Sequence, residues 1–183
     1  MALPPIAKAT LQAALISAGS NVLAQGITSY RDGTHFELDT QTLFQFTTSA
    51  LILSPLTFLW LEALESRFPG FEQRESEKGK KERENQPKIN VWNTVAKIVV
   101  DQVIGGAWNT VAFIATMGML RGHDYEVIKS DILNNFFPFM LAGLKLWPFV
   151  SILNFTVVPA DQRLLVGNLF GVVWGVYLSL MAA

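Results

Sequence analysis

The chain has 183 residues, of which 50% are hydrophobic and only 16% are charged. A soluble domain normally carries about a quarter charged residues, so this composition favours a membrane protein. The formal net charge of -1 gives no reason to expect nucleic acid as a partner. The absence of cysteine excludes a disulfide framework, a thiolate metal site and a cysteine nucleophile. We therefore expect one integral membrane domain over residues 1–183, all-α, with no metal and no cofactor.

Hydrophobic segments recur along the whole chain and predict a polytopic membrane helix bundle. A membrane span needs about 20 residues, and each segment reaches that length. The longest segments must tilt, kink or emerge from the membrane. The fourth contains Trp147-Pro148, where it can bend back, so we predict four to five spans. The segments are Ile6–Thr28, Leu43–Leu64, Val91–Leu120, Ile132–Val158 and Leu164–Ala182.

The stretch Glu72–Asn90 interrupts this pattern with interleaved Glu, Lys and Arg. Such a composition cannot bury enough apolar surface to fold, so we expect a solvent-exposed loop at 72–90. The loop also holds most of the basic residues outside the hydrophobic segments. The positive-inside rule then places the loop and the N-terminus on the cytosolic or matrix side.

Polar and ionisable residues inside the hydrophobic segments are the candidate functional residues. They are costly in lipid, so they face other helices or a watery cavity. Two interpretations remain open: hydrogen bonds that hold the bundle together, or a water-filled path between helices. The candidates are Asn21, Gln25, Lys97, Asp101, Gln102, Lys145, Asn154 and Arg163.

Asp101 is the least easily explained of these residues, because it lies one helical turn deeper in its segment than Lys97. Lys97 can pair with Asp101 at a spacing of four residues, or extend to the membrane interface. A buried pair of Asp101 with Lys145 or with Arg163 would join two helices, and the same groups could line a pore.

Prolines and glycines predict the shape of the bundle. Pro55, Pro148 and Pro159 are expected to kink or interrupt helices, which opens space between them. Small residues at four-residue spacing in the last segment favour close helix packing, and they permit self-association into a homo-oligomer. These are Gly167, Gly171 and Gly175.

The C-terminal third carries a long motif that resembles a known family. It contains Trp147-Pro148, Asn154-Phe155, Val158-Pro159, Arg163, Trp174 and Tyr177-Leu178-Ser179. The motif is similar to that of the peroxisomal membrane protein twenty-two and Mpv-seventeen family. Asp101-Gln102 also resembles the family's Asp-Gln in its third helix. Ser151 departs from the pattern, because the family has Gln there, and this weakens the case for a polar pore lining at that position.

The resemblance implies a small helical protein, with four spans as usually described, in the peroxisomal membrane or alternatively the mitochondrial inner membrane. It implies a passive channel or pore for small hydrophilic metabolites, with the lipid bilayer and small solutes as partners. The alternative is a non-conducting organiser or tether that recruits partners through the charged loop. No catalytic motif was found, so we expect no enzyme.

Overall fold

The computed structural model describes residues 3–70 and 90–181, with side chains described as far as Tyr177. The charged loop predicted at 72–90 lies outside these residues, except for Asn90. The described chain is helical and contains no strand, which confirms the all-α prediction. Its elements are α1 (Pro5–Asp32), α2 (Thr40–Arg67), α3 (Val91–Val100), the π-helical η1 (Asp101–Gly105), α4 (Gly106–Leu120), α5 (Tyr125–Gly143), α6 (Trp147–Thr156), the 3-10 turn η2 (Ala160–Gln162) and α7 (Arg163–Met181).

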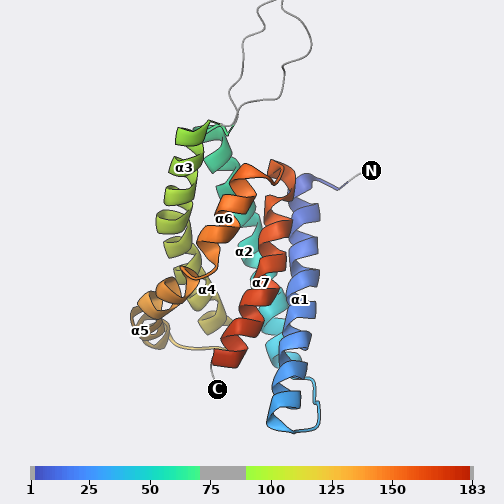
Figure 1. Ribbon diagram of the computed structural model, residues 1–183. Coiled ribbons are helices and arrows are strands. Elements are labelled where there is room, and N and C mark those ends of the chain that lie inside the picture. Colours follow the sequence, from blue (N-terminus) through green and yellow to red (C-terminus); the bar gives the residue numbers. More distant parts are fainter. Residues whose placement is uncertain (1–2, 71–89, 182–183) are drawn as a thin grey trace, which may run out of the picture.

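Helices α1 and α2 form a long antiparallel hairpin (Figure 1). Helix α1 begins with Pro5 in its first turn, where the missing N–H costs nothing. It ends at Gly33, whose φ of 66° is the left-handed conformation that glycine adopts without strain. Helix α2 begins after Asp39, whose carboxylate accepts the Thr42 amide at 2.9 Å and so caps the helix.

Helices α3 and α4 form one continuous run through η1, whereas the following segment is broken. Helices α5 and α6 meet at an angle of 57°, with Pro148 in the first turn of α6. In Figure 1, α5 lies at the lower left of the bundle and α6 rises between α3 and α7. Helix α7 then runs back beside α1, against which it packs.

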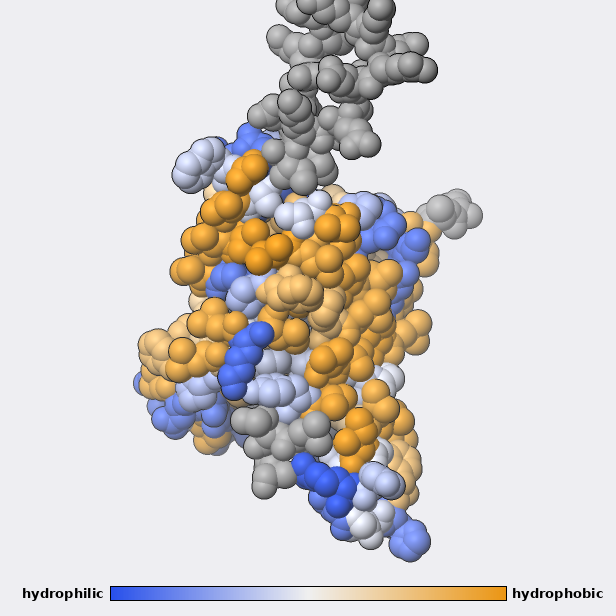
Figure 2. Space-filling model, viewed as in Figure 1, coloured by the Kyte–Doolittle hydropathy of each residue, from blue (hydrophilic) through white to orange (hydrophobic). Residues whose placement is uncertain are grey.

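Helix length and composition identify two candidate membrane spans among the described residues, Thr40–Arg67 and Val91–Leu120, or three if the bent pair α5 and α6 is counted as one span. The count of four to five spans stays a prediction. The outer surface agrees with a lipid environment, because the helices in Figure 2 present mainly hydrophobic residues along their length. Hydrophilic residues gather in that view around the α1–α2 connection and on α5.

The interior is more polar than that of a soluble bundle. Large apolar side chains such as Leu15, Val103 and Val173 are more than half exposed. Polar side chains, in contrast, are buried between the helices. They include Asn21, Gln45, Ser49, Ser54, Thr94, Ser151 and Asn154. This inverted distribution is what the bilayer requires of a bundle that keeps hydrogen-bonding groups away from acyl chains.

Candidate functional site

A cavity of about 870 Å³ runs between the helices of the bundle. Its lining extends from Arg163, at the start of α7, to Arg121, just after α4. Polar groups from α1, α2, α4, α6 and α7 face it, including Ser17, Ser20, Asn21, Ser49, Ser54, Thr57, Asn109, Ser151, Asn154 and Asn168. The volume falls in the range of about 300–1,000 Å³ that is typical of small-molecule sites.

Asp101 lies in the wall of this cavity with both carboxylate oxygens hydrogen-bonded. Trp60 Nε1 of α2 donates to Oδ1 at 3.0 Å, and the Ser151 hydroxyl of α6 donates to Oδ2 at 2.7 Å. Gln102 Nε2 in turn donates to Ser151 Oγ at 2.7 Å. The carboxylate therefore joins α2, η1 and α6 through neutral donors, and it has no cationic partner among the described residues.

The backbone around Asp101 is shaped to hold this contact. Residues Asp101–Gly105 form a π-helical turn, a local widening that is often found at functional sites. Gly105, one π-turn later, leaves the space that the indole and carboxylate occupy. A Cβ at Gly105 would lie 2.8 Å from both Trp60 Nε1 and Asp101 Oδ1, which is too close for either atom.

Three charged side chains meet at the Arg163 end of the cavity. Glu65 Oε2 accepts from Lys97 Nζ at 2.7 Å and also from Arg163 Nη1. Both cations lie against the Phe155 ring, with Lys97 Nζ 5.3 Å and Arg163 Cζ 5.2 Å from its centroid. We call Glu65, Lys97, Arg163 and Phe155 the ion cluster; it joins α2, α3, α6 and α7.

Several buried polar atoms of residues that line the cavity lack a protein partner among the described residues. They are Asn154 Oδ1, Trp108 Nε1 and Asn168 Nδ2. Buried polar groups in native proteins are nearly always hydrogen-bonded to protein, water or a ligand. The hydroxyl and amide side chains in the cavity lining can hydrogen-bond to water or a polar solute, but not to acyl chains.

Most of the polar residues predicted from the sequence line the cavity, and the others lie elsewhere. Asn21, Asp101, Gln102, Asn154 and Arg163 line it. Gln25, Lys97 and Lys145 do not. Gln25 instead ties α1 to the start of α2, because it bonds both the amide and the carbonyl of Asp39, at 2.8 and 3.1 Å.

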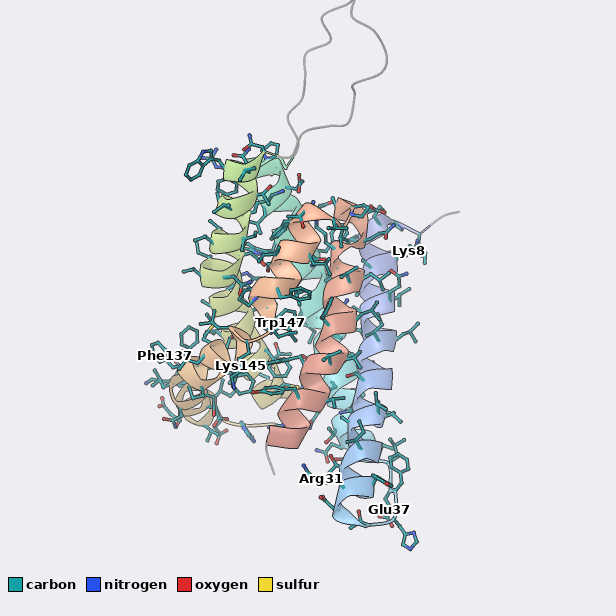
Figure 3. The ribbon with its side chains drawn as sticks, viewed as in Figure 1. Lys8, Arg31, Glu37, Phe137, Lys145 and Trp147 are labelled. Carbon is teal, nitrogen blue, oxygen red and sulfur yellow. The ribbon has the colours of Figure 1, made fainter. Side chains whose placement is uncertain are left out.

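The charge pairs considered from the sequence were wrong. Lys97 pairs with Glu65 rather than Asp101, and its side chain is fully buried. Arg163 also pairs with Glu65. Lys145 donates to the Tyr177 hydroxyl at 2.9 Å, at the bend between α5 and α6, where Figure 3 shows it beside Trp147.

The prolines and glycines have more varied positions than predicted. Pro55 lies inside α2 and Pro148 opens α6, whereas Pro159 lies before η2, in the turn between helices. Gly175 is close to α1, since an added Cβ would lie 3.4 Å from Ser20 Oγ. At Gly171 such a Cβ would meet nothing within 4 Å. Gly171 borders the cavity, so no helix packs closely against it.

Sequence reasoning missed Glu65, Trp60 and the importance of Ser151. A signal for Glu65 was present, because the polar face of α2 that holds Ser54 and Thr57 continues by steps of four residues to Glu65. The predicted hydrophobic segment Leu43–Leu64 stops one residue before Glu65. The departure of Ser151 from the family motif weakened the case for a functional role, yet its side chain, which is shorter than the family's Gln, still reaches Asp101.

Comparison with known proteins finds a family match and several relatives. Residues 118–179 match the model of the Mpv17 / PMP22 family. PXMP2/4 family protein 3 of Dictyostelium discoideum is 29% identical over 178 residues, which cover 97% of this chain and 84% of the relative. Protein sym1 of Schizosaccharomyces pombe is 28% identical over 98% of this chain and 85% of its own length. The Mpv17-like protein of Bos taurus is 30% identical over 67% of this chain and 53% of its own length.

No solved structure matches the chain. The fold and the cavity define a membrane helix bundle with a polar interior. The match to the Mpv17 / PMP22 family over residues 118–179, together with relatives that align along nearly the whole chain, confirms the resemblance seen in the sequence.

Proposed function

We propose that the protein forms a passive pathway for small hydrophilic metabolites across an organelle membrane. The observation that carries this proposal is the 870 Å³ cavity, lined by both polar and apolar side chains, inside a bundle whose outer helix faces are apolar. A packing role alone would be expected to bring the helices together, yet the space beside Gly171 is open. Hydroxyl and amide side chains from several helices also line the cavity, where they can hydrogen-bond to water or a polar solute.

Asp101 is the residue that we assign to the recognition of passing solutes. Its carboxylate borders the cavity, and its hydrogen-bond donors Trp60 and Ser151 are neutral. A fixed charge in a narrow polar passage acts on the charge of every solute that passes it. The ion cluster lies at one end of the cavity, where its movement would control entry.

The membrane is proposed to be that of the peroxisome, with the mitochondrial inner membrane as the alternative. The proposal for the peroxisome rests on the resemblance at Asn21, where the peroxisomal branch of the family is similar to this sequence.

The test is solute efflux from proteoliposomes that contain purified protein, with a variant that fills the cavity. Gly171→Phe places an aromatic ring in the open space beside α7. Val173→Phe is the matched control, because Val173 is on the same helix but is 57% exposed and does not line the cavity. We expect efflux of a small neutral polyol from native protein and Val173→Phe, and strongly reduced efflux from Gly171→Phe.

Absence of efflux from folded native protein would overturn the proposal. The non-conducting organiser would then be the remaining function. Equal efflux from the two phenylalanine variants would show that solutes do not use this cavity.

A further inference from the structure

Lys145 presents a cation to the outside of the bundle. Its side chain is exposed and does not line the cavity. Its Nζ donates to the Tyr177 hydroxyl at 2.9 Å and lies 5.6 Å from the centre of that ring. No carboxylate of the described side chains forms an ion pair with it, whereas Lys97 and Arg163 share Glu65. The charge of Lys145 is therefore left for a partner outside the protein.

The position of Lys145 along the bundle places it in one leaflet. Its partner Tyr177 follows Arg163 by 14 residues on α7, or about 21 Å along the helix axis. Arg163 belongs to the ion cluster, whose Glu65 also accepts the Gly70 amide at 3.0 Å, beside the charged segment. The hydrocarbon core is about 30 Å thick, so Lys145 lies in the half opposite the charged segment. A lysine at that depth extends its ammonium toward the headgroups of the nearer leaflet.

The start of α5 marks the interface on this side of the bundle. Glu126 and Lys129 lie there, exposed and paired with each other at 3.7 Å. Hydrophilic residues gather on α5 in Figure 2, and α5 lies at the height of the lower half of α7 in Figure 1. Figure 3 shows Lys145 in the same region of the molecule. Headgroups are therefore near its ammonium.

Aromatic rings hold the partner of Lys145 in place. Trp147 of α6 packs edge-on against Trp174 of α7, with ring centroids 6.2 Å apart. Trp174 stacks on Tyr177 at 5.4 Å. Tryptophan and tyrosine are enriched at the headgroup level of membrane proteins, because their rings are apolar and their tips are polar. This ladder of rings fits the same depth as the lysine.

The surface around Lys145 suits acyl chains. Leu141 and Leu144 at the end of α5, Phe149 on α6 and Val173 on α7 are all more than half exposed. A small soluble anion would gain nothing from these side chains, whereas the tails of a lipid would cover them.

The donors at this position match a phosphate diester. A lysine ammonium has three N–H donors, and Tyr177 uses one of them. The Tyr177 hydroxyl accepts that bond and still has its own proton to donate. A zwitterionic headgroup would bring a second cation close to Lys145 and be repelled, so a headgroup with net negative charge fits better.

We propose that Lys145 and Tyr177 form a binding site for one anionic phospholipid in the leaflet opposite the charged segment. Its phosphate accepts from the Lys145 ammonium and the Tyr177 hydroxyl, and its tails lie over the exposed apolar residues of α5, α6 and α7. The lipid joins the bend between α5 and α6 to α7 from outside. This site does not depend on conduction through the cavity.

The test counts lipid adducts on the purified protein by native mass spectrometry, with phosphatidylglycerol and phosphatidylcholine as probes. Lys145→Gln removes the charge. Lys129→Gln is the matched control, because it makes the same charge change at an exposed position on α5 where Glu126 already pairs with the lysine. We expect native protein and Lys129→Gln to prefer phosphatidylglycerol, and Lys145→Gln to bind it about fivefold more weakly. Equal phosphatidylglycerol affinities in the two glutamine variants would overturn the site.

A second pair of variants keeps the test decisive if Lys145→Gln does not fold. Tyr177→Phe keeps the ring and removes the hydroxyl donor, so it should weaken phosphatidylglycerol binding by about threefold. Tyr30→Phe is its control, because Tyr30 is 90% exposed at the other end of the chain. Equal phosphatidylglycerol affinities in these two variants would also overturn the site.

A soluble phosphate distinguishes a lipid from a free anion. Glycerol 3-phosphate carries a phosphate but no tails, so we expect it to leave bound phosphatidylglycerol in place at equal concentration. Displacement of the lipid by glycerol 3-phosphate would reassign the position to a soluble anion and overturn the lipid site. Equal binding of phosphatidylcholine and phosphatidylglycerol to native protein would overturn its charge preference and the proposal with it.

Discussion

Replacing Gly105 with alanine tests how tightly the Asp101 contact is built. The new Cβ would lie 2.8 Å from Trp60 Nε1 and from Asp101 Oδ1, atoms that are themselves only 3.0 Å apart. The indole cannot easily retreat, because Trp60 packs edge-on against Trp108 with ring centroids 6.2 Å apart. The substitution must therefore open the hydrogen bond.

The expected loss of stability combines three effects. Overpacking a tight site costs about 1–3 kcal/mol. Losing a hydrogen bond between membrane helices costs about 0.6 kcal/mol on average and up to about 1.7. Alanine regains up to about 1 kcal/mol of helix propensity over glycine. We predict that Gly105→Ala lowers the free energy of unfolding by roughly 1–3 kcal/mol.

The neighbouring glycine provides the control. A Cβ at Gly106 would meet its nearest neighbour, Met140 Cε, at 3.5 Å, which is ordinary van der Waals contact. Gly106→Ala should therefore be neutral or slightly stabilising. Unfolding of both variants in mixed detergent micelles gives the comparison. If Gly105→Ala proves as stable as Gly106→Ala, the geometry assigned to Trp60 and Asp101 is refuted.

Further predictions concern the α4–α5 contact, the Lys145 bond and the cap of α2. Gly118→Ala should lower the free energy of unfolding by about 1–3 kcal/mol, because its Cβ would lie 2.8 Å from Ile128 Cγ1. In a double-mutant cycle, the added substitution Ile128→Ala should recover part of this loss. Strictly additive effects of the two substitutions on the free energy of unfolding would contradict the contact. Tyr177→Phe removes the 2.9 Å hydrogen bond from Lys145, but it should change the free energy of unfolding by less than about 1 kcal/mol because the pair is exposed. A larger loss in the same unfolding assay would contradict an exposed, weak bond. The Thr42 hydroxyl and amide hold the pKa of Asp39 below its ordinary value of 3.8, so the cap is complete above that pH and weakens as the pH falls through the lower, folded-state pKa. Hydrogen exchange at the Thr42 amide should therefore show lost protection in acid, and protection that is unchanged between about pH 6 and about pH 2 would argue against the cap.

Local sequence patterns were sufficient to predict the helices and the polar residues of the interior. Within the residues that the structure describes, each hydrophobic segment is mainly helical, and the segment from Ile132 is broken where Trp147-Pro148 predicted a bend. Asn21 and Asn154 were found because a polar side chain in an apolar segment has few other acceptable environments. Both line the cavity.

Partner choice could not be predicted from the same patterns. Glu65 and Arg163 are 98 residues apart, and nothing in helical spacing says which faces of α2 and α7 meet. The turn of η1 adds to the problem, because a π-helical turn changes the direction of every side chain after Asp101. The spacing of four residues between Lys97 and Asp101 permits a pair, but the bundle gives each residue a different partner.

Cysteine labelling tests the central claim most directly, namely that the cavity beside α7 holds water. The chain has no cysteine, so a single introduced thiol has no background. Gly171→Cys points into open space in the cavity wall, and Val173→Cys points outward from the same helix. In protein reconstituted in bilayers, a charged thiol reagent that does not dissolve in lipid should modify Gly171→Cys and spare Val173→Cys. Modification of Val173→Cys with Gly171→Cys unreactive would contradict the account.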